Sequence, residues 1–62
     1  MARWVSRDKV WRVEAYQDRC GRRAVLITVH GVLLVSGVTP GYELRMKLRN
    51  LGAPPLQDME EI

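Results

Sequence analysis

The segment RRAVLITVHGVLLVS, residues 22–36, decides how this chain folds. It contains two runs rich in β-branched residues, which favour strands, and His30-Gly31 separates the two runs. Glycine readily adopts the positive φ of a two-residue hairpin turn, and histidine adopts it more readily than a β-branched residue does. The segment therefore predicts a β-hairpin, with one strand over residues 22–29 and the next over residues 32–36.

Pairing these two strands about the turn places apolar side chains on both faces of the hairpin. A single helix can cover only one face, whereas the other face of a free antiparallel sheet usually contacts water. The uncovered face is expected to carry Leu26, Thr28, Leu33 and Val35, with Leu26 opposite Val35 and Thr28 opposite Leu33. Because an exposed apolar patch marks an interaction site or an aggregation hazard, these four residues are the candidate interface with a second copy or another protein.

A further strand is expected upstream of the hairpin, over residues 9–16. The sequence KVWRVEAY there alternates apolar and aromatic residues with charged ones, a period of two that fits a half-buried strand. A helix capped by Ser6 is the alternative, and its longer period fits this alternation less well. Residues 17–21 are polar and end in glycine, which predicts a hairpin loop into the next strand. Residues 3–5 are a candidate extra edge segment.

A helix is expected over residues 40–51. Its leucines fall on one side, at Leu44, Leu48 and Leu51. Thr39 is placed to cap the helix with Pro40 in its first position, and Gly52 is placed to end it. Residues 42–49 also alternate like a strand, which is the alternative, but they are strong helix formers with stop signals at both ends.

The expected fold class is α+β, a small antiparallel three-stranded sheet made of two consecutive hairpins and followed by one C-terminal helix, in the order ββ(β)α. The 62 residues allow one domain. We assign a compact basic domain to residues 1–52 and a proline-containing acidic tail to residues 53–62. The tail is expected to be extended past its prolines, with its apolar residues free to dock or to form a short helical turn.

A domain of this size usually needs help to stay folded, because it buries only about 60% of the surface that its unfolded chain exposes. Cys20 is the only cysteine and His30 the only histidine, so neither a disulfide nor a four-ligand zinc site can form within one chain. Self-association is the stabiliser that remains. A homodimer is therefore expected.

The distribution of charge indicates a basic body with an acidic end. All ten Lys and Arg lie within residues 1–52, whereas residues 53–62 hold three acidic residues and no base. The candidate phosphate-binding residues are Arg19, Arg22, Arg23, Arg45 and Arg49, because loop and helix arginines suit phosphate contacts. A genome rich in G and C would also favour arginine codons whatever the function. The acidic tail is either simply solvated or folded back over the basic surface in competition with phosphate.

Catalysis is poorly supported by the sequence. No glycine-rich phosphate loop is present, and Cys20 and His30 are predicted at opposite ends of one strand, roughly 25 Å apart at about 3.3 Å per residue. We therefore expect no enzyme, no catalytic residue, no metal, no cofactor and no small-molecule substrate. The longest apolar stretch is too short and too polar to span a bilayer, and the N-terminus lacks a signal-peptide pattern, so we expect a cytoplasmic protein.

Two function classes follow from these observations. The first hypothesis is a small non-enzymatic interaction module, homo-oligomeric, that binds a protein partner through an apolar sheet face. The alternative is a small basic DNA- or RNA-binding regulatory protein, for example in transcription, that uses its loop and helix arginines.

Overall fold

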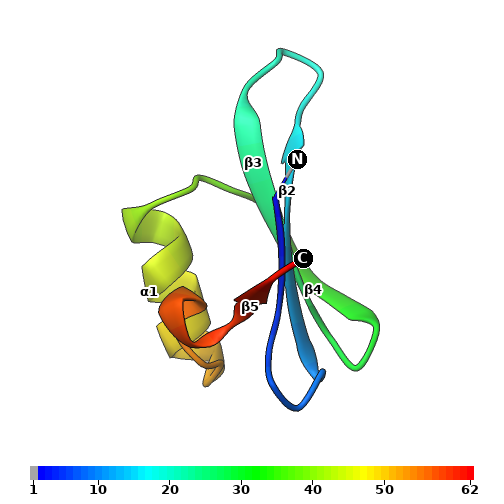
Figure 1. Ribbon diagram of the computed structural model, residues 1–62. Coiled ribbons are helices and arrows are strands. Elements are labelled where there is room, and N and C mark those ends of the chain that lie inside the picture. The colour runs from blue at the N-terminus through cyan, green and yellow to red at the C-terminus, as the bar shows by residue number, and fades with distance from the viewer. Residues whose placement is uncertain (1) are drawn as a thin grey trace.

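The computed structural model describes residues 2–62, which form a twisted antiparallel sheet with one α-helix beside it (Figure 1). The strands are β1 (Arg3–Val5), β2 (Trp11–Gln17), β3 (Arg23–Val29), β4 (Val32–Val38) and β5 (Glu60–Glu61), and the helices are α1 (Tyr42–Leu51) and the 3₁₀ helix η1 (Leu56–Asp58). The strands lie side by side in the order β4-β3-β2-β1-β5. The α+β class is confirmed, and so is the helical assignment of the segment that also alternates like a strand.

The predicted number of three strands is wrong, because the sheet has five. The candidate edge segment is β1, but it is not at the edge, since β5 pairs outside it with Val5 opposite Glu60. The amide of Ile62 continues this pairing by donating a hydrogen bond to the carbonyl of Arg3 at 2.9 Å. The end of the chain therefore completes the sheet, although two paired residues are too short a run for any sequence pattern to reveal.

The β3–β4 hairpin has the predicted two-residue turn, with φ of 50° at His30 and 77° at Gly31. The pairing of Thr28 with Leu33 is also as predicted. Beyond it the ladder has one irregularity before Ile27 and a second after it. Ile27 lies opposite Val35, so the predicted pairing of Val35 with Leu26 is wrong. An extra residue in one strand reverses the alternation of the residues that follow, so Val35 moves to the helix-covered face.

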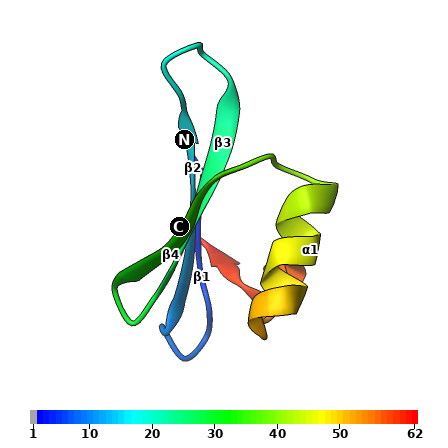
Figure 2. The same ribbon diagram turned by 180° about the vertical axis from the view of Figure 1, so that it is seen from behind.

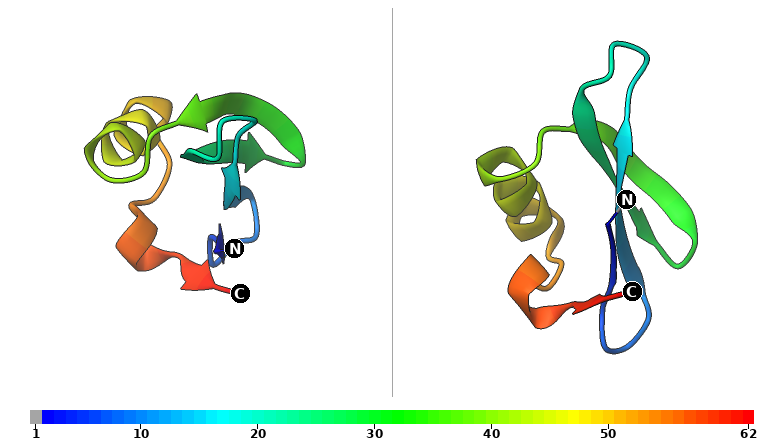
Figure 3. Two further views of the ribbon diagram at one scale, coloured as in Figure 1. Left: turned by 90° about the horizontal axis from the view of Figure 1, so that it is seen from above. Right: turned by 45° about the horizontal axis from the view of Figure 1, so that its top comes forward.

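The hydrophobic core lies between this face of the sheet and the helices. Its buried members are Val13, Val25, Ile27, Val38, Leu44, Leu48 and Met59. Half-buried Trp4, Trp11, Val35, Leu51, Ala53 and Leu56 pack around them. Seen from above, α1 and η1 lie on the same side of the sheet (Figure 3). The segment that follows α1 thus extends the layer that covers the core, and the docking of the tail through Leu56 and Met59 is part of the fold.

The start of α1 differs from the predicted one. The helix begins at Tyr42, and Gly41 precedes it with a φ of 98°, so Thr39 and Pro40 lie outside it. The positive φ at Gly41 is a backbone conformation that residues with a side chain rarely adopt. Thr39 was expected to accept a hydrogen bond from an amide of the first turn. Instead, its own amide donates to Glu43 Oε1 at 3.3 Å. The predicted end is confirmed, with Gly52 left-handed after the last turn.

A polar turn built on Ser6 joins β1 to β2. Ser6 is 2% exposed, and its hydroxyl donates to Asp8 Oδ1 at 2.6 Å while accepting a hydrogen bond from the Trp11 amide at 2.9 Å. The bond from Ser6, with a second from the Val10 amide, holds the pKa of Asp8 below its ordinary value of 3.8. Ser6 therefore orders a hairpin turn and does not cap a helix.

Candidate interaction surfaces

One face of the sheet has neither helix against it (Figure 2). We call this the open face and define it by six residues that pair across the strands: Arg3, Arg12, Glu14, Leu26, Thr28 and Leu33. Its β1–β2 half is charged, and Arg3 Nε lies 4.0 Å from Glu14 Oε1. Its β3–β4 half carries the apolar side chains. The open face is thus more apolar toward β4, because Arg12 and Glu14 lie on its β2 part, beside Val5 and Tyr16.

The apolar half of the sheet ends at a free edge, formed by β4. Three consecutive large apolar residues there are exposed: Val32 is 61%, Leu33 56% and Leu34 39% accessible. We call these three residues the β4 edge patch. An edge strand also presents backbone amide and carbonyl groups that have no partner strand. Val32 lies opposite Val29 on the helix-covered side and Leu33 lies opposite Thr28 on the open face, so exposed apolar side chains flank the hydrogen-bonding edge on both sides of the sheet.

The four residues predicted as an interface occupy different positions. Leu26 and Thr28 are half-buried on the open face, and Leu33 is exposed beside them. Val35 lies on the opposite face and packs against the core. The prediction did not include Val32 and Leu34, because the expected alternation of the hairpin placed both on the helix-covered face.

The predicted phosphate-binding arginines are in three places. Arg19 and Arg22 lie in the β2–β3 loop, whose backbone is held by Asp18: its Oδ1 accepts from the amides of Cys20 and Arg22, each at 2.9 Å. Arg23 begins β3 and pairs with Gln17, on the face that α1 covers. The remaining two candidates, Arg45 and Arg49, are exposed on α1. The structure therefore divides the set between one hairpin loop, one strand and one helix.

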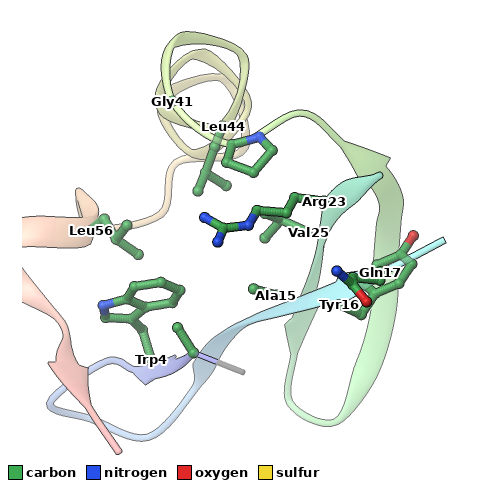
Figure 4. Close-up of a pocket in the computed structure, with 11 residues that line it drawn as sticks. Trp4, Ala15, Tyr16, Gln17, Arg23, Val25, Gly41, Leu44 and Leu56 are labelled. Atoms are coloured by element: carbon green, nitrogen blue, oxygen red, sulfur yellow. The ribbon is translucent and has the colours of Figure 1, made fainter. Parts of the chain in front are cut away.

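A cavity of about 520 Å³ opens between the start of α1 and the sheet. Its lining is mostly apolar and includes Trp4, Ala15, Val25, Leu44 and Leu56, while Arg23 contributes the one charged side chain. Figure 4 shows the guanidinium of Arg23 extending among Leu44, Leu56 and Trp4. The sequence contains no signal for this cavity, because it depends on the distance between a helix and a sheet.

A second cavity, of about 440 Å³, lies on the other side of Leu56. It is lined by one side of α1 and by the segment that follows the helix: Arg45, Leu48, Arg49, Gly52, Ala53, Pro55, Leu56 and Gln57. Arg45 is also stacked on Tyr42, with its Cζ 5.9 Å from the ring centre. Arg45 and Arg49 therefore border this second cavity, and no residue of the β2–β3 loop lines it.

Cys20 and His30 do not form a common site. Cys20 is exposed in the β2–β3 loop, and His30 is exposed in the turn at the other end of β3. Within residues 2–62, no three His, Cys, Asp or Glu side chains come together in a way that could hold a metal ion. Over the same residues, no helix has the length and hydrophobicity needed to cross a membrane.

No family model matches this chain, and no curated protein or solved structure is significantly similar to it. Its function therefore has to be argued from its own residues.

Proposed function

We propose that this protein is a small non-enzymatic interaction module that associates with a second copy of itself, and with protein partners, through the β4 edge patch and the adjoining apolar half of the open face. The observation that carries this proposal is the exposure of three consecutive large apolar side chains, 39% or more each, on a free edge strand. Among residues 2–62, the other exposed large apolar side chains are Tyr42 on α1 and Ile62 after β5, whereas Leu26 is half-buried on the open face.

The sequence of β4 supports a pairing role for this edge. Sheet proteins usually protect an edge strand with lysine, proline, an inward charge or a β-bulge. VLLVSGV contains no charged residue and no proline, and its two irregularities lie beyond Leu33, so the residues next to the turn are the part without such protection. The irregularities opposite Ile27 bend the second half of the strand, so the part nearest the turn is the regular, accessible part. An unprotected edge of this kind is suited to adding a strand from a partner.

The total exposed surface also supports a partner. The chain has 4596 Å² of accessible surface, whereas a monomer of 7.1 kDa is expected to expose about 4100 Å². A typical specific interface buries about 800 Å² on each partner, so an interface over β4 and the neighbouring open face would more than remove this excess. A strand that pairs antiparallel with its own copy forms a two-fold interface, the commonest symmetry of soluble dimers.

The first test is the mass in solution of the wild type and of Leu33→Lys. The wild type is expected to have twice its 7.1 kDa chain mass at roughly 100 μM in light scattering. Leu33→Lys is expected to be monomeric, because two lysines would face each other close to the two-fold axis. Tyr42→Lys is the matched control, since it adds the same charge at a 70% exposed apolar residue on α1 and should leave the dimer intact.

Circular dichroism of both variants shows whether the fold is kept. A wild type that is monomeric at this concentration and unfolds cooperatively would contradict self-association. Dissociation by Tyr42→Lys as well as by Leu33→Lys would show that added charge, and not the β4 edge, controls the assembly.

One observation favours nucleic acid as a second candidate partner. The β2–β3 hairpin projects past the rest of the sheet (Figure 1), and its loop carries exposed Arg19 and Arg22. In residues 2–62 the one ion pair within 4.0 Å is that of Arg3 with Glu14, so the loop arginines have no protein carboxylate to neutralise them. A two-stranded ribbon of this kind can enter the major groove of DNA, and its arginines would then meet phosphates.

The salt dependence of binding tests this second candidate. Affinity for a random DNA duplex should fall with salt, with a log–log slope of about −0.9 per neutralised phosphate. Arg19→Ala with Arg22→Ala should make the slope shallower by about two such contacts, whereas the matched pair Arg45→Ala with Arg49→Ala should leave it unchanged. Fluorescence anisotropy at several salt concentrations measures both slopes. Absence of binding to duplex and single strands at about 50 mM salt would eliminate this candidate.

A further inference from the structure

The cavity beside the start of α1 is on the opposite side of the sheet from the open face. Its walls come from five elements: β1 with Trp4, β2 with Ala15, β3 with Val25, α1 with Leu44, and η1 with Leu56. Because these segments also form the core, the cavity is a gap between packed layers and not a groove on a mobile loop. Its volume of about 520 Å³ is within the range of roughly 300–1000 Å³ of small-molecule sites.

The lining combines an aromatic and aliphatic surface with a single charge. The indole of Trp4 and the side chains of Leu44 and Leu56 surround the space in Figure 4, and the phenol of Tyr16 points away from it. Among the residues that line the cavity, Arg23 is the only charged one, and there is no Asp or Glu. A ligand with an apolar body would therefore find apolar contacts on several sides and one cation.

Arg23 is the exposed first residue of β3 and lines the cavity. Its side chain lies on the same face of β3 as Val25 and Ile27, because side chains two residues apart point to the same side of a sheet. The guanidinium therefore extends beneath the start of α1, and none of the hydrogen bonds or ion pairs among residues 2–62 involves it. A planar guanidinium binds a carboxylate or a phosphate through two parallel hydrogen bonds, and its single positive charge matches the single negative charge of a carboxylate.

We propose that this cavity binds a small amphipathic carboxylate, a molecule with one carboxylate and an apolar chain of medium length. The carboxylate binds the guanidinium of Arg23, and the apolar body lies against Trp4, Leu44 and Leu56. Complementary charge and the apolar lining carry this assignment. The assignment does not rest on the proposed self-association, because no residue of the β4 edge patch and none of the six residues that define the open face lines the cavity.

Calorimetric titration with octanoate and with neutral octanamide tests the proposal. Octanoate is expected to bind with one site per chain, and octanamide about tenfold more weakly, because it lacks the charge-assisted hydrogen bonds to Arg23. Arg23→Gln should remove the preference for octanoate. Arg22→Gln is the matched control, since it removes the neighbouring charge outside the cavity and should keep that preference.

The site itself is located by two further measurements. Octanoate should shift the NMR signals of the Trp4 indole and leave those of Trp11, which pairs with Val29 near the far end of the sheet, in place. Ala15→Leu fills the floor of the cavity and should weaken octanoate and octanamide alike. No binding of octanoate at about 10 mM, or binding that both Arg23→Gln and Ala15→Leu leave unchanged, would overturn the proposal.

Discussion

Leu48→Ala is expected to remove half or more of the free energy of unfolding. Leu48 is 1% exposed and packs from α1 onto the sheet, and a buried leucine-to-alanine change costs about 2–5 kcal/mol. A chain of this length has only about 3–9 kcal/mol in total, at roughly 0.05–0.15 kcal/mol per residue. Urea unfolding followed by tryptophan fluorescence measures the loss.

The protein concentration must be equal in all samples, because a dimer gains stability with concentration. Lys47→Ala, an exposed neighbour on the same helix, is the control and should change the unfolding free energy by about 0.5 kcal/mol or less. A loss of under about 1 kcal/mol for Leu48→Ala would contradict the packing of α1 against the sheet, because a leucine buried in the core makes contacts whose removal costs more than this.

Removing residues 57–62 is expected to destabilise the whole fold. Met59 is 8% exposed within the core cluster, and loss of a buried methionine side chain alone costs about 2–5 kcal/mol. The same deletion removes β5 and leaves β1 as an edge. Thermal unfolding should therefore show a large fall in Tm, and at 25 °C part of the truncated chain should be unfolded.

The matched control keeps the strand and changes only its charge. Glu60→Gln with Glu61→Gln removes two exposed acids and should leave the Tm almost unchanged. If the tail acted only as an electrostatic shield over the basic surface, the charge variant would reproduce every effect of the truncation, and the truncated chain would unfold at the wild-type temperature.

Local patterns were enough to predict the hairpin at His30 and the helix with its leucine side. Both depend on neighbours in sequence: a turn that needs positive φ, and apolar residues three and four apart. The irregularities opposite Ile27 were not predictable, because a bulge is a property of a strand pair. They account for the misplaced Val35. Residues 32–36 of β4 were identified as a strand, but its last two residues were assigned to the entrance of the helix.

The candidate sites were predictable only in part, for a related reason. The composition identified Arg23 as a candidate cation but grouped it with Arg19 and Arg22, its neighbours in sequence. The strand alternation separates it from them, because the first residue of β3 lies on the helix-covered face. Whether an apolar strand is central or at an edge, and whether a helix leaves space beside a sheet, depends on contacts between residues far apart in the chain.

The two edges of the sheet differ in a way that would limit the size of an assembly formed through β4. The β5 edge is two residues long and carries Glu60 and Glu61, both exposed, whereas β4 has seven residues and no charge. Acidic side chains on a short strand discourage a further strand from adding there. Each copy then has one edge, β4, that can pair with another copy, and a two-fold dimer uses the β4 edges of both copies. Association through β4 would therefore stop at two chains, and the glutamates at the other end would keep the sheet from polymerising into an open-ended filament.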